Sequence, residues 1–321
     1  RSVLVAVALV GDVEGVMGRQ VGAWGRGEGA LLGVAAVWGA TFVMVKDAVA
    51  VMPPMTFNAL RCGLAVVVLL VVGRGRVAGI GARLWGAGVV IGLALCAGYV
   101  LQVFGLQTTT PARAGFFTGV AVVLVPFLNG RLRGRDIAAA AVALAGIALL
   151  SLPGGPLGSG EVRGGWLVLG DWLVLGCAVA FALQIVLLGR FAPQADPVSL
   201  ATVQVLVMAA VCALAAPLAA PQGRVLGAIP SWSSVPANVW IAAAFTGILA
   251  TAAAFVIQAH AQRATTPERT ALIFATEPLF AAVTSWWLIG EKLSGWGWLG
   301  GALIVTAMVT AALTPSQSSQ P

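Results

Sequence analysis

The chain has 321 residues, of which 60% are hydrophobic and 9% are charged, and its formal net charge is +7. Soluble proteins carry about 25% charged residues, so this composition excludes a soluble fold, which could not cover itself with polar surface. The long uncharged runs, among them 84–112, 137–160, 197–223 and 225–262, reach or exceed the roughly 18 residues of a membrane-spanning helix. We therefore predict an all-α integral membrane protein.

Breaking the apolar runs at glycines, prolines and charge clusters predicts ten transmembrane helices of about 20 residues each. In chain order they cover 30–46, 54–73, 84–106, 110–130, 136–152, 166–188, 197–220, 236–259, 269–290 and 294–314. The first 28 residues hold an apolar run too short to span, so we expect a disordered or surface-lying extension over 1–28. A first repeat over 29–153, a linker over 154–165, a second repeat over 166–314 and a tail over 315–321 follow.

The two halves of the chain carry copies of one segment. Residues 99–113 and 255–269 align without a gap and share six identities in fifteen positions, including Thr-Thr-Pro-x-Arg. Each copy lies between two apolar runs, and five predicted spans separate the copies, so they enter the membrane from opposite sides. Two inverted five-helix repeats of this kind are typical of secondary transporters, which bind substrate between the halves near the bilayer midplane.

Basic residues are distributed unevenly over the predicted loops. With the N-terminus inside, eleven basic residues lie on the cytoplasmic side and five on the outer side. The positive-inside rule then places both termini in the cytoplasm, with the chain in the cell membrane. This topology and contact with anionic membrane lipid account for the positive charge, and we predict no nucleic-acid partner.

Enzymatic functions have little support in the sequence. The four cysteines, Cys62, Cys96, Cys177 and Cys212, lie inside predicted spans without metal-ligand spacing, so we interpret them as small packing residues. We predict no cofactor and no metal site. No HExxH, CxxC, Walker or GxSxG motif occurs, which argues against an enzyme and against an ATP-driven pump.

Several segments resemble a known family. The stretches WGATFVMVKDAV (38–49) and MPPMTFNALRCGLA (52–65) resemble the opening helix pair of EamA-type members of the drug/metabolite transporter superfamily. Residues 98–127 resemble their third and fourth helices, and 265–294 resemble their ninth and tenth. The resemblance implies a ten-helix carrier that works by alternating access on a small-molecule substrate, often exporting amino acids, metabolites or toxic compounds.

The first half departs from that pattern after its fourth helix. From Pro126 to Pro153 there are 27 residues, whereas 37 separate Pro278 from Pro315 in the second half. The end of the fourth helix and its following loop are therefore shortened. This favours an alternative function, a non-transporting membrane scaffold or partner subunit that keeps the carrier fold.

Charged groups inside the spans are candidates for substrate binding because they are costly in hydrocarbon. Glu277, roughly 10 Å into the ninth span by helix rise, could bind a cationic group or couple transport to protons. Alternatively, it hydrogen-bonds backbone groups freed by Pro278. Arg61, roughly 10 Å into the second span, would attract a carboxylate or phosphate, or else snorkel or reach a backbone carbonyl near the outer face.

Uncharged polar and aromatic residues complete the predicted cavity. Gln102 and Gln258 are equivalent in the two repeats and either face a shared cavity or bridge neighbouring helices. Further lining candidates are Trp38, Thr41, Asn58, Tyr99, Thr118 and Gln184. His260, Asp171, Trp286 and Trp287 are interpreted as residues of helix ends or of the lipid interface.

The sequence thus predicts a secondary carrier that exports a small amphipathic metabolite or amino acid. Besides the scaffold, a third hypothesis is an intramembrane enzyme acting on lipid-linked substrates, which would need a second carboxylate or a histidine close to Glu277. The substrate, the coupling ion and the oligomeric state stay open.

Overall fold

The computed structural model describes residues 26–109, 111–130, 133–150, 169–217, 235–289 and 295–313. The predicted linker, the tail and nearly all of the N-terminal extension lie outside these residues. The regular structure of the described part is helical: α2 (Arg26–Val51), α3 (Pro54–Gly73), η1 (Arg76–Gly79), α4 (Ala82–Thr108), α5 (Pro111–Gly119), α6 (Ala121–Asn129), α7 (Gly134–Leu150), α8 (Leu169–Phe191), η2 (Ala192–Gln194), α9 (Pro197–Ala215), α10 (Ala237–Gly247), η4 (Ile248–Ala253), α11 (Ala254–Ala261), α12 (Pro267–Phe274), α13 (Glu277–Ile289) and α14 (Gly295–Leu313).

Six helical stretches are long and apolar enough to cross a bilayer. They are Arg26–Val51, Pro54–Gly73, Ala82–Thr108, Leu169–Gln194, Pro197–Ala215 and Ala237–Ala261. Local sequence fixes several of their ends. Pro54 occupies the first turn of α3, where its missing N–H costs nothing, and the Asp196 carboxylate caps α9 by accepting from the Ser199 N–H. The chain is therefore a multi-pass membrane protein, as predicted.

Two segments that we predicted as continuous helices are broken in the middle. The fourth segment, 110–130, consists of α5 and α6, which meet at Val120. The ninth, 269–290, consists of α12 and α13, separated by Ala275 and Thr276. Pro278 accounts for the second break, because it lacks the N–H that would continue the helical hydrogen-bond pattern. The eighth segment stays helical but contains the π-helical stretch η4.

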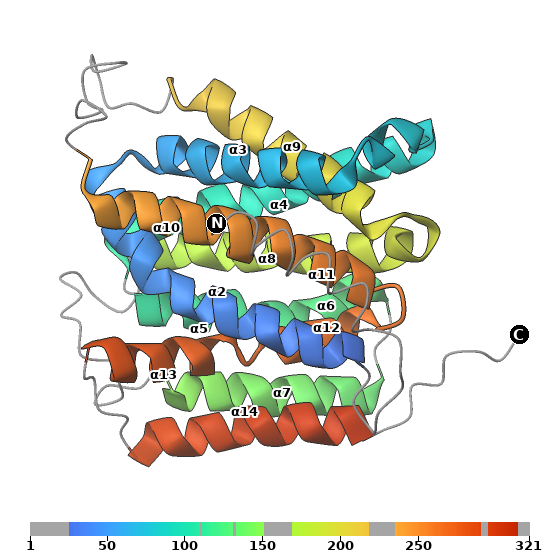
Figure 1. Cartoon of the computed structure of the whole chain (residues 1–321). Helices are drawn as coiled ribbons and strands as arrows, with labels where there is room; N and C mark the ends of the chain where they lie inside the picture. The colour runs from blue at the N-terminus through green and yellow to red at the C-terminus, as the bar shows by residue number, and fades with distance from the viewer. Residues whose placement is uncertain are drawn as a thin grey trace, which may run out of the picture.

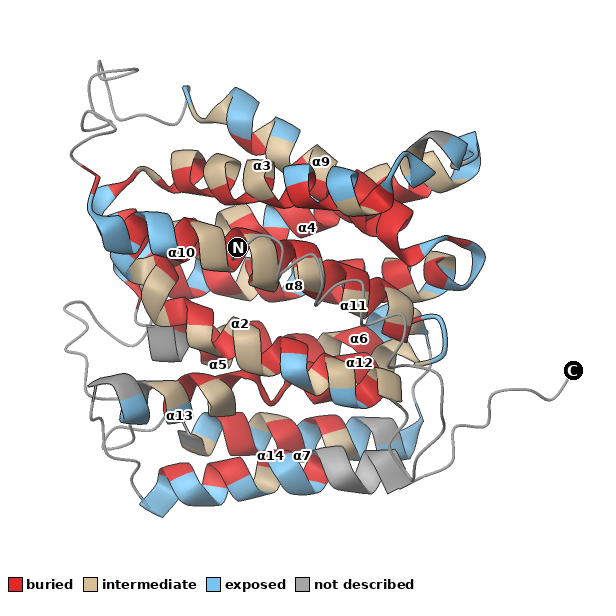
Figure 2. Cartoon of the chain, in the orientation of Figure 1, coloured by how far each residue is buried: buried red, intermediate tan, exposed pale blue. Residues whose placement is uncertain are grey.

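The helices lie side by side and run across the molecule from one end to the other (Figure 1). α4 packs on α8 and α9, α3 on α9, α2 on α13, and α7 on α14. Buried residues fill the space between the helices, whereas the outward faces are exposed (Figure 2). Several of the exposed residues are large and apolar, such as Trp172 at 59%, Trp287 at 79% and Trp298 at 64% exposed. Such an apolar exterior is suited to contact with lipid.

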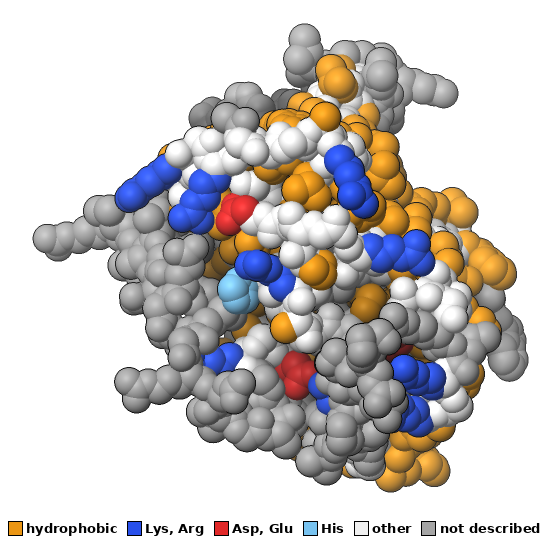
Figure 3. Space-filling view, turned by 90° about the vertical axis from the view of Figure 1, so that its right-hand side faces the viewer, with side chains coloured by type: hydrophobic (Ala, Val, Ile, Leu, Met, Phe, Trp, Pro, Cys, Tyr) orange, Lys and Arg blue, Asp and Glu red, His pale blue; other side chains and the backbone are white. Residues whose placement is uncertain are grey.

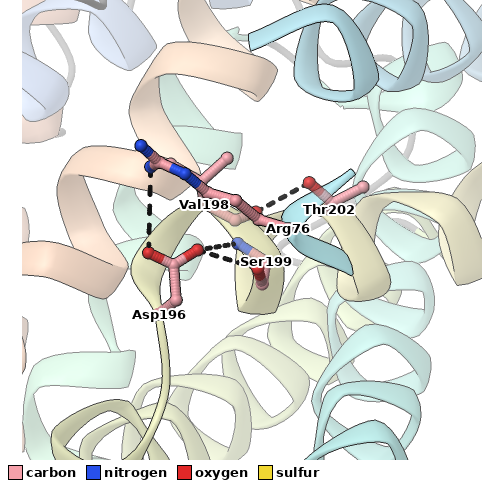
Figure 4. A network of polar contacts seen from close by, with 5 residues as sticks. All are labelled: Arg76, Asp196, Val198, Ser199 and Thr202. Carbon is pink, nitrogen blue, oxygen red and sulfur yellow. Dashed lines mark hydrogen bonds and ion pairs between the residues drawn. The ribbon is translucent and has the colours of Figure 1, made fainter. Parts of the chain in front are cut away.

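One end of the bundle is rich in arginine, and we call it the basic end (Figure 3). It contains η1 and the starts of α2, α9 and α12, at the right of Figure 1. A guanidinium nitrogen of Arg76 lies 3.9 Å from Asp196, which ties η1 to the start of α9 (Figure 4). Asp196 also accepts from the Ser199 backbone N–H at 2.9 Å and hydroxyl at 2.8 Å. This network fixes the turn between α8 and α9.

The opposite end is held by a second polar network. The Lys46 ammonium donates to the carbonyl oxygens of Leu106 at 3.2 Å and Thr109 at 2.6 Å. It thereby satisfies carbonyls at the end of α4 that have no partner within the helix. The Thr109 hydroxyl in turn donates to the Asp171 carboxylate at 2.5 Å. The end of α2, the end of α4 and the start of α8 therefore meet here.

Candidate functional site

A pocket lies in the centre of the bundle and encloses about 870 Å³ of space, counting its open mouth. Nine of the ten residues predicted from the sequence line it: Trp38, Thr41, Arg61, Tyr99, Gln102, Thr118, Gln184, Gln258 and Glu277. They come from both halves of the chain. The structure thus brings nine predicted residues together, while their role in binding substrate stays a prediction.

Trp38 forms the centre of an aromatic wall. Its indole Nε1 donates to the carbonyl oxygen of Ala250 at 2.7 Å. Ala250 lies in the π-helical stretch η4. A π-helical turn breaks the regular α-helical pairing and is frequent at functional sites. The Trp38 ring contacts the rings of Phe255, with centroids 5.7 Å apart, and Phe274, 4.8 Å apart. One polar contact and two ring contacts therefore fix the orientation of this side chain.

The aromatic wall is built from equivalent positions of the two halves. Residues 27–43 align with 170–186, with five identities in seventeen positions, and this pairs Trp38 with Phe181. The other alignment pairs Tyr99 with Phe255. Phe181 and Tyr99 are in edge contact, with centroids 5.8 Å apart, which repeats the contact of Trp38 with Phe255. Sequence reasoning missed Phe181 and Phe255, although the repeat alignment contained the signal.

Arg61 is a buried cation at the edge of the pocket. Its guanidinium carbon lies 4.3 Å from the centroid of the Tyr99 ring and 5.6 Å from that of Phe57. Arg61 is only 4% exposed, so the side chain does not snorkel to the surface. Within the described part of the chain, its Nε and Nη2 atoms have no hydrogen-bond partner. A cation held by two rings with unused donors is able to bind an anionic group.

Glu277 occupies the break between α12 and α13. It is 8% exposed, lines the pocket and lies in the first turn of α13, where the helix dipole favours a negative charge. No other described residue forms a hydrogen bond or salt bridge with its carboxylate. The alternative role, in which it satisfies backbone groups freed by Pro278, therefore has no contact to support it here. A carboxylate that is buried without a partner is costly unless it binds a cation or a proton.

Glutamine side chains form a chain of amides beside the pocket. Gln258 donates to Gln184 Oε1 at 3.1 Å and to Gln262 Oε1 at 3.1 Å, and Gln184 donates to Gln204 Oε1 at 3.2 Å. Gln258 thus lines the cavity and also bridges helices, which combines both sequence interpretations. On the other side, Gln102 donates to the Thr118 hydroxyl at 3.4 Å. Gln204 is buried like its neighbours. It is also a polar side chain inside a predicted span, so the sequence reasoning that selected Gln184 could have selected Gln204 as well.

One prediction from sequence needs correction. Asn58 does not line the pocket; it is fully buried, and its amide atoms have no partner among the described residues. Three residues along a helix differ by about 60° in direction and about 4.5 Å in height, so Asn58 and Arg61 point to different places. Asp171 lies at a helix end as predicted, in the first turn of α8, where it is 1% exposed and accepts a hydrogen bond from the Thr109 hydroxyl. The four cysteines are buried free thiols, in agreement with a packing role.

Comparisons with known proteins agree with this architecture. An uncharacterized transporter of Archaeoglobus fulgidus is 29% identical over 287 residues, which cover 87% of this chain and 83% of that protein. The permease-like protein YdzE of Bacillus subtilis is 31% identical over 65 residues, which cover 20% of this chain and 83% of that protein. A solved crystal structure matches with a TM-score of 0.68 at 23% identity, over 88% of this chain and 95% of the other; this shows the fold alone.

The family comparison covers both halves. The model of the EamA-like transporter family matches residues 25–152 and again residues 168–313. Together, these matches contain the helices that form the pocket and both copies of the Thr-Thr-Pro-x-Arg segment. The chain belongs to the EamA-like transporter family.

Proposed function

We propose that the protein is a secondary carrier that moves a small amphipathic metabolite or amino acid by alternating access, in the direction of export. The observation that carries the proposal is the pocket, whose walls come from equivalent positions of both halves. The broken fourth and ninth segments add support, because discontinuous helices beside a central site are typical of secondary transporters.

The same proposal includes ten spans in two inverted repeats, with both termini in the cytoplasm of a cell-membrane protein. In its support, the equivalent helices α2 and α8 start at opposite ends of the bundle. The arginine-rich end then faces the cytoplasm, following the positive-inside rule. The shorter helices that we count as spans are α7, α14 and the pairs α5–α6 and α12–α13.

The substrate that best complements the pocket is a zwitterion with an apolar or aromatic body. Arg61 would bind its carboxylate with the unused Nε and Nη2 donors, and Glu277 would bind its ammonium group. The rings around Trp38 offer flat surfaces for the apolar part. When no substrate is bound, a proton on Glu277 would remove the cost of its buried charge, which couples export to proton entry.

The test is uptake and efflux of labelled amino acids and metabolites in proteoliposomes, with and without a pH gradient. We expect saturable flux that follows the gradient in the natural chain, and flux that no longer follows it in Glu277→Gln. Asp47→Asn, which makes the same change on an exposed part of α2, is the control and should behave like the natural chain. Amino acid amides, which lack the carboxylate, should compete poorly.

The alternative function, a scaffold or partner subunit that does not transport, is favoured by one observation. α6 ends at Asn129, three residues after Pro126, whereas α13 continues to Ile289. Against it, Asn129 still reaches the basic end, where its amide donates to Glu268 at 2.5 Å. Absence of flux for every compound, from protein that is demonstrably folded, would favour the scaffold. The intramembrane enzyme loses support because the described pocket lining has no histidine and no second carboxylate.

A further inference from the structure

Each half of the chain begins its first helix with an acidic residue, and the two acids are equivalent in sequence. Glu28 lies in the first turn of α2 and Asp171 in the first turn of α8. The alignment of 27–43 with 170–186 pairs them. Glu28 lies at the basic end, and Asp171 lies at the opposite end with Thr109 and Lys46. The eighteen residues from Glu28 to Lys46 span about 27 Å of helix, so the two acids are separated by most of a bilayer.

Glu28 binds the other half of the chain. Its Oε1 atom accepts from Nη1 of Arg269 at 2.9 Å, with side-chain exposures of 7% and 21%. Arg269 is the arginine of the second Thr-Thr-Pro-x-Arg segment and lies at the start of α12, where Thr266 caps the helix. Asn129 and Glu268 make a further bond between the halves at this end, with 2.5 Å between the amide nitrogen and the carboxylate oxygen.

Asp171 binds the first half through the other copy of this segment, at its first residue and not at its arginine. It accepts from the hydroxyl of Thr109, and both residues are 1% exposed. Thr109 opens the first Thr-Thr-Pro-x-Arg segment, which the alignment pairs with the segment that contains Arg269. At each end, therefore, the acid from the first helix of one half contacts the Thr-Thr-Pro-x-Arg segment of the other half.

The packing around the two acids is equivalent as well. A Cβ atom on Gly27 would lie 3.4 Å from Ala261, and one on Gly170 would lie 2.5 Å from the carbonyl oxygen of Gly105. Gly105 and Ala261 are themselves paired by the alignment of the repeated segments. The glycine before each acid therefore approaches the same position of the opposite half. The two polar contacts belong to two equivalent docking sites.

We propose that these contacts are the two gates of the carrier: the basic-end clasp, Glu28 with Arg269, and the opposite-end clasp, Asp171 with Thr109. This inference rests on the proposed alternating access. Each clasp joins the two halves at one end only, so rocking of the halves about the pocket must open one clasp while the other holds. Both clasps are formed in this structure. The acids thus set which end of the pocket is open.

The experiment measures access to the pocket from each side of the membrane. Ala121→Cys, on the pocket wall, is the reporter, and the native thiols are 3% exposed or less. A membrane-impermeant maleimide is applied to intact cells and to inverted membrane vesicles. Glu28→Ala and Asp171→Ala are compared in this background, with Arg76→Ala as the control because it breaks an exposed contact at the basic end.

Glu28→Ala should raise labelling from the basic end by about fivefold or more, the lower limit of typical coupling between two states. Asp171→Ala should raise it from the opposite end only. The exchanged acids, Glu28→Asp and Asp171→Glu, should restore most of the parent pattern, and Arg76→Ala should leave it unchanged. Thermal unfolding in detergent identifies alanine variants that do not fold. In that case the labelling of the exchanged-acid variants is compared with that of the parent protein instead.

Equal gains from both sides, or no change from either side, in folded protein would overturn the proposal. Labelling requires neither substrate nor flux, so a negative transport assay does not affect its outcome. Conversely, a carrier that transports normally when both clasps are removed would refute the gates and leave the proposed function intact.

Discussion

Gly39 is a point of close approach between α2 and the broken ninth segment. A Cβ atom at this position would lie 2.6 Å from the carbonyl oxygen of Glu277, 2.8 Å from the backbone nitrogen of Ala281 and 2.8 Å from Cβ of Phe280. Heavy atoms in comfortable contact are about 3.5 Å apart or more, so Gly39→Ala must separate α2 from α13 by several tenths of an ångström. Two of the three atoms belong to the backbone and cannot rotate away.

Gly33 on the same helix provides the control, because a Cβ there would meet nothing within 4 Å. Gly33→Ala should stabilise the protein by about 0.5–1 kcal/mol, since alanine loses less backbone entropy in a helix. Gly39→Ala has the same gain but an overpacking cost of about 1–3 kcal/mol. We therefore expect Gly39→Ala to be less stable than Gly33→Ala by about 1–3 kcal/mol.

Thermal unfolding of both variants in one detergent measures this difference. Gly39→Ala should also weaken transport, because the displaced helix carries Glu277 into a different position relative to Trp38. If Gly39→Ala unfolds at the same temperature as Gly33→Ala, α2 and α13 do not pack as closely as the structure places them. The assignment of Glu277 to the pocket would then fail as well.

Three further outcomes are expected. Trp38→Phe loses the bond to Ala250 but keeps the ring contacts, so KM for the transported solute should rise severalfold with little change in unfolding temperature; unchanged KM would exclude Trp38 from the site. Gln184→Leu leaves neighbouring buried amides without partners and should cost about 1–3 kcal/mol of stability, seen by thermal unfolding, whereas Gln194→Leu at the surface should be neutral. Lys46→Met exposes the carbonyl oxygens at the end of α4, and hydrogen exchange at 105–109 should accelerate; equal exchange would contradict the cap.

Much of the fold could be predicted from local signals. α3 covers 54–73 as expected, because Pro54 fits the first turn of a helix and Arg74 ends it in a left-handed conformation. The breaks within the fourth and ninth segments were not predicted. In the ninth segment, an apolar run that contains Pro278 looks the same in sequence whether the helix bends or stops. In the fourth, the break at Val120 lies six residues before Pro126, which is inside α6, so the proline does not mark it.

The pocket residues differ in how well sequence could find them. Polar side chains such as Gln184 and Glu277 stand out in an apolar run, and those side chains do gather around one cavity. Phe181 and Phe255 were missed because a single aromatic ring that faces the pocket has the same signature as one that faces lipid; only their pairing with Trp38 and Tyr99 in the repeat alignments distinguishes them. Asn58 was misplaced because the rotation of α3 about its axis depends on contacts with α9 that sequence does not reveal.

The central claim is that the pocket between the halves is the substrate site of a carrier. The most direct test is saturable uptake of a panel of labelled amino acids into proteoliposomes that contain the natural chain, Trp38→Ala or Trp298→Ala. Trp298 is 64% exposed on the outside of the bundle. Trp298→Ala is therefore the control, because it removes the same side chain at a position away from the pocket. We expect uptake of at least one solute by the natural chain and by Trp298→Ala, and its loss in Trp38→Ala. Uptake that survives Trp38→Ala unchanged, or no uptake by folded natural protein, would contradict the claim.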